Sequence, residues 1–434
     1  MGQKVLVIGS GAREHTIAYT LLKAPSIDEV TVAPGNPGML KDGIHTTHLS
    51  QSNHAALIEF VKNNGYDWVF VGPEVPLIEG IVDDFAAAGI KAFGPSKAAA
   101  QIEGSKDFAK QLMDRHNIPT AQYKTFSDLE MAQDYVHEHG APIVIKADGL
   151  ALGKGVLICE NEEQAADGVK EIMLDKKFGA SGNHVVVEEF LTGPEVSVLS
   201  FTDGKVVKPM VSSMDHKRAN DHDTGLNTGG MGTVAPNPYY TPAIAAECME
   251  KIFLPTIQAM NAEGCPFKGC LYFGLMLTPD GPKVIEYNCR FGDPETQVVL
   301  PLLESDLLHI MQACTNGTLA EQEVKFSDGA AACVILASGG YPVAYEKGKP
   351  ITGLVDGQLP DEPDVTVYHS GTAITEDGQL VTNGGRVLGV TATAPGLPRA
   401  IAIAYEAAEH IHFDKLHKRT DIGMRALKAL AEKQ

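Results

Sequence analysis

The sequence is short of positive charge and contains no long apolar run. Its 35 lysines and arginines face 55 aspartates and glutamates, which gives a formal net charge of −20. A surface this acidic disfavours nucleic acid and anionic membranes, so we expect neither as a partner. No segment approaches the length of a membrane span, and the N-terminus enters a predicted strand at Lys4 without a cationic apolar leader. We therefore expect a cytoplasmic protein that acts on small molecules.

Closely spaced cysteines are also missing. The seven cysteines include no Cys-x-x-Cys pair, and Cys265 and Cys270 are too far apart to form one. Reduced thiols in a cytosolic protein are the simplest account of this pattern.

The rest of the composition is ordinary for a globular protein, with 44% hydrophobic and 21% charged residues. A chain of 434 residues should form about three domains of ~150 residues each. Much of the abundant glycine lies in loops between periodic segments, which is typical of ligand-binding turns. Strands alternate with helices in the first third, and short β segments follow later. The pattern predicts an α/β and α+β multidomain fold.

The chain begins with a strand, a glycine turn and a helix. Lys4–Ile8 is a buried-strand pattern, Gly9-Ser-Gly11 is the turn, and Ala12–Lys23 is helical in pattern. Free amides and the helix dipole point at such a turn and favour an anion. Glu14 stands where a dinucleotide fingerprint has its third glycine, and no acidic residue ends the second strand, Val30–Ala33. A smaller phosphate ester is therefore a better ligand than a nicotinamide cofactor.

Further strands at Asp67–Val71 and Gly89–Phe93 predict a parallel sheet with helices on both faces. Ligands bind at the carboxyl ends of the strands in such sheets. Ordinary turn chemistry is an equally good explanation of the glycines there. The candidate substrate-binding residues at this edge are Gly9, Gly11, Arg13, Glu14, Gly35, Asn36, Gly72, Pro73 and Glu74.

Two lysines and a glycine loop mark the middle of the chain. Lys106 opens a helix with Ser105 as its N-cap, and Lys146 lies in the apolar strand Ile143–Ala147. A lysine in so short a strand must reach a counter-charge or extend to solvent. The loop Gly149–Gly155 lies between two strands and can close over phosphates, with Lys154 supplying charge. It is not a P-loop, whose Gly-Lys-Ser/Thr opens a helix.

Two polar segments follow. The strand His184–Phe190 ends in Glu188 and Glu189; its backbone can pair with a purine edge, and Glu195 can accept ribose hydroxyls. The segment Asp215–Gly232 is a solvated surface loop, a His/Asp metal site or a substrate-closing loop. We favour the last, because the histidine spacing does not suit a compact metal site and the polar content suits a closing loop.

A β-hairpin is predicted where the apolar run Leu271–Leu277 is followed by turn formers and then by Lys283–Gln297. Alternate strand residues share a face, so Glu286, Asn288 and Arg290 lie together. Clustering such groups is costly without a ligand. The alternative is a charged edge strand with its polar face in water.

The opposite face of this strand, Ile285, Tyr287 and Cys289, suits a buried core. The carboxylate and amide oxygens on the polar face suit Mg²⁺, which takes its further ligands from water and substrate phosphates. Asp293 and Glu295 follow in a turn that contains a proline.

The last hundred residues show strand patterns at Ala331–Ala337, Val365–His369 and Arg386–Ala392, and a helix pattern at Leu397–His410. These patterns predict a small mixed domain, to which the sequence assigns no catalytic role.

Taken in order, these pieces resemble the ATP-grasp superfamily. The octapeptide Arg290–Gln297 (RFGDPETQ) resembles the signature of the phosphoribosylamine–glycine ligase (glycinamide ribonucleotide synthetase) family, and Val5–His15, Asp215–Gly232 and Arg419–Gly423 are similar to that family too. The resemblance covers essentially the whole chain. It implies an N-terminal Rossmann-like domain at 1–104, an ATP-grasp domain at 105–327 with a mobile lid at about 120–192, and a C-terminal mixed α/β domain at 328–434. The length is near that of the stand-alone enzyme, so we do not expect a multifunctional fusion.

The resemblance also implies an activity in de novo purine biosynthesis. ATP phosphorylates the carboxylate of glycine to glycyl phosphate, and the amine of 5-phosphoribosylamine then attacks it, giving glycinamide ribonucleotide, ADP and phosphate. The implied cofactors are ATP and Mg²⁺ or Mn²⁺, and we expect a monomer or at most a weak dimer.

Residue roles follow from the resemblance at the matching positions. ATP would be held by Lys106, Lys146, Gly149, Gly153, Gly155, Glu188, Glu189, Leu191 and Glu195. Catalytic roles fall to Arg290, Asp293, Glu295, Asp215 and Lys217, and the metal ligands are Glu286 and Asn288. ATP-grasp enzymes often add a metal carboxylate from the preceding strand, but Leu271–Leu277 contains none, so the remaining ligand set is open.

Three other functions remain to be tested against this one. They are an ATP-grasp ligase for another acid and amine, a non-catalytic nucleotide-binding protein, and a dinucleotide oxidoreductase.

Overall fold

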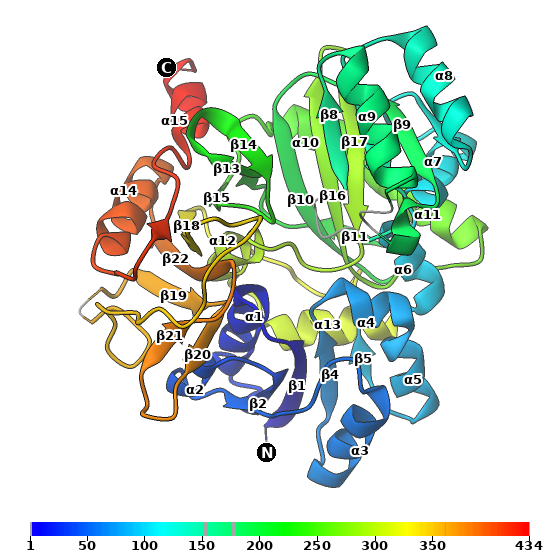
Figure 1. Ribbon diagram of the computed structural model, residues 1–434. Helices are drawn as coiled ribbons and strands as arrows, with labels where there is room; N and C mark the ends of the chain where they lie inside the picture. The colour runs from blue at the N-terminus through cyan, green and yellow to red at the C-terminus, as the bar shows by residue number, and fades with distance from the viewer. Residues whose placement is uncertain (1, 151–154, 176–178, 361, 434) are drawn as a thin grey trace.

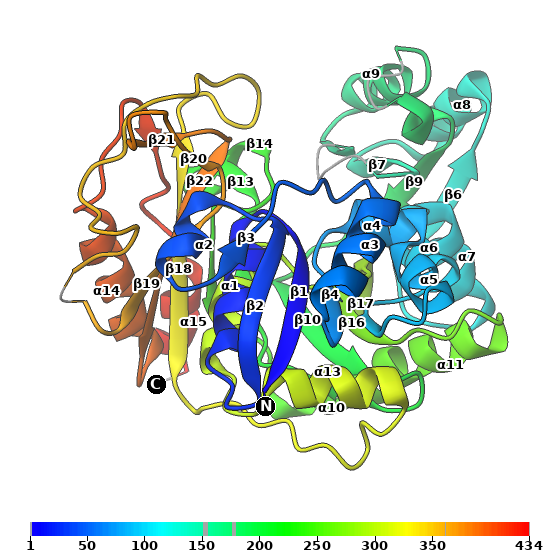
Figure 2. The ribbon, with the colours of Figure 1, turned by 90° about the horizontal axis from the view of Figure 1, so that it is seen from below.

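The computed structural model describes residues 2–150, 155–175, 179–360 and 362–433. In two perpendicular views, an N-terminal sheet, a small outer layer and a C-terminal sheet surround a central antiparallel sheet (Figures 1 and 2). No helix in these ranges is both long and apolar enough to cross a membrane. All seven cysteines are buried and none is in a disulfide.

The N-terminal sheet is parallel, as the alternation of strands and helices predicts. Its order is β3-β2-β1-β4-β5. Val5 and Val7 on one face of β1, and Leu6 and Ile8 on the other, are fully buried in two separate clusters. Apolar residues on both faces require helices on both sides. The elements are β1 (Gln3–Gly9), α1 (Ala12–Leu22), β2 (Ile27–Pro34), α2 (Pro37–Lys41), β3 (His45–Thr46), α3 (His54–Asn64), β4 (Trp68–Val71), α4 (Glu74–Glu79), α5 (Ile81–Ala87), β5 (Ala92–Phe93) and α6 (Lys97–Gly104).

The segment expected to form a lid is a layer with its own core, at the upper right of Figure 1. Its antiparallel sheet has the order β6-β9-β7-β8. Apolar side chains of α8 and α9, such as Val136 and Ile172, pack onto Ile145 and Val187 of the sheet. A separate core allows this layer to move as one body. The elements of this layer are β6 (Tyr123–Phe126), α8 (Leu129–His139), β7 (Ile143–Ala147), β8 (Val156–Cys159), α9 (Glu162–Met173) and β9 (Val185–Glu189). The helix before it, α7 (Lys106–Arg115), packs into the cluster that covers one face of the N-terminal sheet.

The central sheet contains the predicted hairpin, which is confirmed as β16 and β17. Its order is β11-β10-β16-β17, and its pairings are antiparallel. The elements are β10 (Glu195–Thr202), β11 (Val207–Pro209), α10 (Pro242–Cys248), α11 (Leu254–Ala262), β16 (Gly269–Thr278), β17 (Gly281–Asn288), α12 (Thr296–Val299) and α13 (Leu307–Asn316).

A β-bulge in β17 corrects one expectation. Gly274 pairs with Glu286 but the next residue of β16 pairs with Val284, so Ile285 is the extra residue. Tyr287 and Cys289 are buried as expected, together with Val284. The prediction that Ile285 lies on that buried face was wrong, because the bulge shifts the alternation by one residue. Ile285 is partly exposed and lines the cavity that is described in the next section.

The C-terminal sheet includes two strands from the middle of the chain. Its order is β12-β15-β18-β22-β19, with β23 also paired to β18. The segment from β12 to β15 therefore belongs to one sheet with the last hundred residues. The elements are β12 (Met214–Asp215), β13 (Arg218–Asn220), β14 (Thr224–Asn227), β15 (Gly232–Ala235), β18 (Ala330–Ser338), β19 (Val365–His369), β20 (Thr372–Ile374), β21 (Leu380–Thr382), β22 (Arg386–Ala394), α14 (Leu397–Ala408), β23 (Leu416–His417) and α15 (Met424–Ala431).

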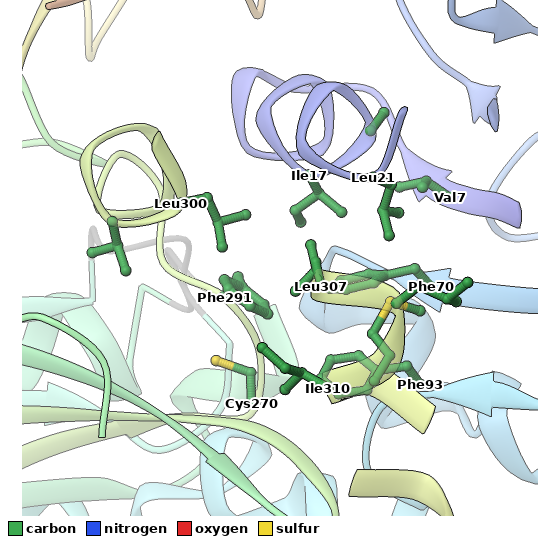
Figure 3. Packing of buried hydrophobic residues seen from close by; sticks show 14 of the residues in the cluster. Val7, Ile17, Leu21, Phe70, Phe93, Cys270, Phe291, Leu300, Leu307 and Ile310 are labelled. Carbon is green, nitrogen blue, oxygen red and sulfur yellow. The ribbon is translucent and has the colours of Figure 1, made fainter. Parts of the chain in front are cut away.

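The octapeptide Arg290–Gln297 is anchored in a core cluster that is shown in Figure 3. Phe291 packs against Phe70 and Phe93 of the N-terminal sheet, with ring centroids 5.6 and 6.5 Å apart. It also meets Phe201 of the central sheet at 5.9 Å. Large aromatic side chains contribute much of the burial energy of a core. The turn after β17 is therefore fixed between two sheets.

Candidate active site

A cavity of about 860 Å³ lies where the N-terminal, central, lid and C-terminal parts meet. It contains most of the predicted functional residues, which the chain contributes from widely separated positions. Those that line it are Arg13, Glu74, Lys106, Lys146, Gly155, Glu188, Glu189, Leu191, Glu195, Asp215, Lys217, Glu286, Asn288, Arg290, Asp293 and Glu295.

Lys106 is held at the first turn of α7. Ser105 caps the helix, its hydroxyl accepting from the amide of Phe108 at 3.1 Å. The Lys106 ammonium donates to the carbonyl oxygen of Gly149 at 3.0 Å and has no carboxylate within 4 Å among the described residues. Burial and the nearby Lys146 lower the pKa of Lys106. A buried cation without a counter-ion favours an anionic ligand.

Lys146 and Glu188 form a buried ion pair in the cavity wall near Lys106. Lys146 Nζ lies 2.9 Å from Glu188 Oε2 and also donates to the bulged carbonyl of Ile285 at 2.9 Å. Lys110, one turn after Lys106 on α7, lies 3.3 Å from the same carboxylate oxygen. The expectation that Lys146 must reach a counter-charge is confirmed.

Glu286 forms an ion pair with Lys217 in the cavity wall. Their charged atoms are 2.7 Å apart, and Glu195 lies 3.9 Å from the same ammonium. Burial opposes ionisation of Glu286, but Lys217 together with Lys146 and Lys106 outweighs it and lowers the pKa of Glu286 to about 2. Asn288 lies two residues further along β17, and its amide nitrogen can donate to Glu103 at 3.0 Å. The described residues contain no group of three or more acidic, histidine or cysteine side chains that could hold a metal ion.

Arg290 joins the hairpin to the N-terminal part. Its guanidinium donates to Glu74 at 3.1 Å, to Glu103 at 3.0 Å and to the carbonyl of Phe291 at 3.2 Å. Burial would raise the pKa of Glu74, but Arg290 and Arg13 lower it to about 2. The predicted substrate contact of Arg290 is therefore accompanied by a structural role.

Asp215, which is partly buried, and Glu295, which is buried, are carboxyl groups with no cation within 4 Å among the described residues. Glu295 Oε1 accepts from the Ser197 hydroxyl at 3.2 Å, and Asp215 Oδ1 accepts from the amide of His216 at 2.7 Å. Burial, reinforced by Glu295, raises the pKa of Asp215 well above its usual range. Two carboxyl groups of this kind beside a cavity favour a cationic ligand.

The C-terminal part also reaches the cavity. Arg386 donates to the carboxylate of Asp293 at 2.9 Å and to the carbonyl oxygens of Gly229 at 2.7 Å and Asp293 at 2.9 Å. The amide of Gly229 donates to the Tyr341 hydroxyl at 3.0 Å. Two side chains of the last domain therefore fix the loops that carry Asp293 and Gly229.

The segment expected to close over substrate contains the hairpin β13–β14, which is tied to the end of the chain. Arg419 binds Asp223 at 2.9 Å and Asp421 at 2.8 Å, although it is almost fully buried. The amide of Thr420 donates to Asp221 at 2.8 Å. The chain's closing Arg-Thr-Asp motif therefore anchors the hairpin over one end of the cavity.

The predicted glycine turn at the start of α1 is filled by the protein itself. Glu14 Oε2 accepts from the amide of Gly11 at 2.8 Å. A Cβ atom on Gly9 would lie 2.4 Å from Glu14 Cγ, and one on Gly72 would lie 2.3 Å from Glu14 Oε1. These glycines make room for the carboxylate, which takes the position that an anion would occupy at this helix end.

Other predicted positions lie outside the cavity lining. Asn36 caps α2 and donates to the carbonyl of His369 at 2.8 Å. Gly149 contributes its carbonyl to Lys106, and Gly153 lies outside the described residues. Of the nine residues proposed at the N-terminal sheet edge, the structure brings Arg13 and Glu74 to the cavity wall.

The lining residues that the sequence prediction missed include Glu103, Lys110, Tyr272 and Arg386. Lys110 could have been found, because it lies one helical turn from Lys106 and shares its face. The others carry no local signal, since each reaches the cavity only through contacts between distant parts of the chain.

Three family models match the chain in sequence order. They describe the phosphoribosylglycinamide synthetase N domain at residues 3–103, its ATP-grasp (A) domain at 104–296 and its C domain at 331–425. A phosphoribosylamine–glycine ligase of Vibrio vulnificus (strain YJ016) is 47% identical over 98% of this chain and 98% of its own length. A chicken trifunctional purine biosynthetic protein is 49% identical, and this chain covers 43% of its length.

Solved structures agree with this assignment. A phosphoribosylamine–glycine ligase from Thermotoga maritima matches with a TM-score of 0.83 and 34% identity, covering 96% of this chain and 100% of that one. A Campylobacter jejuni biotin carboxylase in complex with an ATP analogue matches at 0.74 with 16% identity, covering 96% and 93%, and shares the fold. The chain belongs to the phosphoribosylglycinamide synthetase family, whose middle domain is an ATP-grasp domain.

Proposed function

We propose that this protein joins glycine to 5-phosphoribosylamine with ATP, giving glycinamide ribonucleotide, ADP and phosphate. The observation that carries the proposal is one cavity that holds a lysine, Lys106, and two carboxyl groups, Asp215 and Glu295, none of which has an ion-pair partner among the described residues. Lys106 suits a nucleotide phosphate, and Asp215 with Glu295 suits an ammonium group. A small amino acid that is activated by a nucleotide needs both.

In this proposal, the nucleotide binds between the lid layer and the central sheet. Lys106 and Lys146 would contact its phosphates, while Glu188, Glu189 and Leu191 line the wall for the base. Transfer of a phosphoryl group depends mainly on positioning and on stabilising charge, so fixed cations are the main requirement.

Glu286 and Asn288 fit a divalent cation that takes its other ligands from phosphates. Glu286 is ionised near neutral pH and both side chains line the cavity. Mg²⁺ is commonly bound by one or two protein oxygens together with substrate phosphates. When bound, such an ion would neutralise charge on the phosphates. Lys217 pairs with Glu286 at this position.

Glycine would bind with its ammonium at Asp215 and Glu295. Its carboxylate oxygen would attack the terminal phosphorus of ATP, forming glycyl phosphate and breaking the bond to ADP. The amine of phosphoribosylamine, entering from the side of Arg13 and Glu74, would then attack the acyl carbon. Phosphate leaves as the new C–N bond forms, and the nitrogen gives up a proton.

Water must be kept from the acyl phosphate, which it would hydrolyse. The lid layer and the anchored β13–β14 hairpin flank the cavity and are suited to exclude solvent.

The test is ADP release measured with a coupled assay. Glycine and phosphoribosylamine together should stimulate release, while alanine and serine should do so weakly. Stimulation by a different acid and amine, with none from this pair, would reject the assignment. Nucleotide binding without turnover would instead indicate a non-catalytic protein.

A further inference from the structure

Lys110 is a buried lysine of the cavity that has no role in the mechanism above. It lies on α7 one turn after Lys106, and its side chain is only 3% exposed. A fully buried lysine is rare unless it is paired. Lys110 therefore needs a charged partner, and that partner is Glu188, which lines the proposed nucleotide site.

The ammonium of Lys110 has three neighbours. It lies 3.3 Å from Glu188 Oε2 and donates to the Thr120 hydroxyl at 2.8 Å and to the carbonyl of Ala121 at 3.4 Å. Lys146 contacts the same Glu188 oxygen at 2.9 Å. One carboxylate oxygen is thus held by two ammonium groups.

The second oxygen of Glu188 is left without a partner. Within the described part of the chain, Glu188 Oε1 is buried and accepts no hydrogen bond, although Glu188 lines the cavity. A buried unpaired carboxylate oxygen is costly, so it favours a ligand that brings a donor. Because Oε2 is fixed, the direction of Oε1 is fixed as well.

We propose that Lys110 is a positioning residue for nucleotide recognition: by holding Glu188 together with Lys146, it orients Glu188 Oε1 to accept a hydrogen bond from an amino group of the base. This rests on the proposed nucleotide site and adds a basis for its specificity. Adenine carries an exocyclic amino donor, whereas hypoxanthine carries a carbonyl oxygen at that position. An ionised carboxylate accepts from the first and repels the second.

The same geometry predicts a dependence on pH. Lys110 faces Glu188 and Glu189 from β9, Lys146 from β7 and the ring of Tyr123 from β6. Burial, together with repulsion from Lys146, lowers the pKa of Lys110 to about 8 despite the attraction of Glu188. Raising the pH through that value removes the cation, so nucleotide affinity should fall in the alkaline range.

The experiment compares Lys110→Met, Lys110→Arg and Glu188→Gln in the glycine-dependent ADP-release assay. Lys110→Met should raise the KM for ATP roughly tenfold, the size expected for one charged hydrogen bond, with little change in kcat. Lys110→Arg should recover most of the affinity and keep it at alkaline pH. Lys124→Met, at an exposed lysine of β6 that does not line the cavity, is the matched control and should be unchanged.

Two further measurements separate positioning from a general structural effect. The preference for ATP over inosine triphosphate should fall in Lys110→Met and in Glu188→Gln, and Lys110→Met should add little in the Glu188→Gln background. Additive effects, or a wild-type KM for ATP that stays constant through alkaline pH, would overturn the proposal. That pH measurement uses the wild-type protein, so it tests the proposal even if Lys110→Met does not fold. If the wild-type protein shows no glycine-dependent turnover, the proposed function itself is rejected instead.

Discussion

The pKa values of two carboxyl groups in one cavity are shifted in opposite directions by their surroundings. Burial would raise the pKa of Glu286, but Lys217 together with Lys146 and Lys106 lowers it to about 2. Burial raises the pKa of Asp215, and the nearby Glu295 adds to this effect. Environments that separate the pKa values of similar groups usually assign them different roles. At the scale of the residue, Glu286 is suited to a metal ion and Asp215 to a ligand that brings its own positive charge.

Replacing Glu286 with glutamine tests the first role. We expect Glu286→Gln to lower kcat about 100-fold, because several kcal/mol of charge stabilisation at the phosphates would be lost. The melting temperature should change little, since the side chain lies at a cavity surface. The control is Glu247→Gln in helix α10, which removes a surface ion pair with Lys251 and should keep full activity. Wild-type turnover by Glu286→Gln would contradict the assignment.

The raised pKa of Asp215 predicts weaker glycine binding in acid. As the pH falls through that pKa, the carboxyl gains a proton and can no longer attract the ammonium of glycine. The KM for glycine should therefore rise at low pH, while the KM for ATP changes less. Asp215→Asn should raise the KM at every pH, by roughly tenfold or more, and should flatten its acid dependence. Steady-state kinetics across the pH range provide the measurement. An unchanged acid dependence in Asp215→Asn would place the titrating group elsewhere.

At the scale of the element, one turn and one strand differ from what local patterns predict. The turn before α1 has the glycines of an anion site, but Glu14 fills it. The strand β17 has the expected polar face, but a bulge at Ile285 breaks its alternation. The bulge has no signature in the sequence, because it depends on which residues of β16 lie opposite. The contact between Gly11 and Glu14 is local, since it spans three residues at the start of α1. The helix, the strand and their order were all predictable from periodicity.

A pair of glycine variants tests the packing of that turn. Gly9 has a φ of +128°, and an added Cβ would lie 2.4 Å from Glu14 Cγ. Gly65 has a φ of +65° at the end of α3, with open space around it. Gly65→Ala should cost about 1 kcal/mol from backbone strain alone. Gly9→Ala should cost about 3 kcal/mol, because a clash adds to the strain. Urea unfolding of both proteins measures the difference, and equal costs would mean that Glu14 moves aside freely.

At the scale of the whole molecule, the C-terminal part completes the cavity and locks onto the N-terminal part. Arg386 binds Asp293, and the sheet that carries Arg386 includes β12 and β15 from the middle of the chain. On the other side, the amide of His369 donates to His15 Nδ1 at 2.9 Å, and His15 Nε2 contacts Asp42 at 2.7 Å. The last domain is thus joined to both of the others.

The buried His369 makes stability depend on pH. Burial, followed by the nearby His15, lowers the pKa of His369 to about 4. Unfolding restores a pKa near 6.5, so the unfolded chain binds more protons below that value and stability falls as the pH drops from about 6.5 towards 4. The loss approaches ~1.4 kcal/mol for each pH unit in that window. Denaturant unfolding should show a shallower decline for His369→Gln than for the wild type, whereas the exposed variant His412→Gln should follow the wild type. Parallel curves for all three proteins would exclude His369 as the source.

The sequence by itself determined the order of strands and helices, the parallel N-terminal sheet, the late hairpin and the polar face with Glu286 and Asn288. These are local properties: apolar periodicity sets the element, and alternation along a strand sets the face. Lys106, Lys146 and the octapeptide were likewise readable, because they form a fixed pattern in chain order.

Only the tertiary structure decided which of these groups are paired and which are open to a ligand. Arg290 is paired with Glu74 and Glu103, and Arg386 of the last domain binds Asp293. The physical reason is that charge pairing and burial depend on distances between segments far apart in the chain. Those distances are set by how the sheets pack, and no local pattern records them.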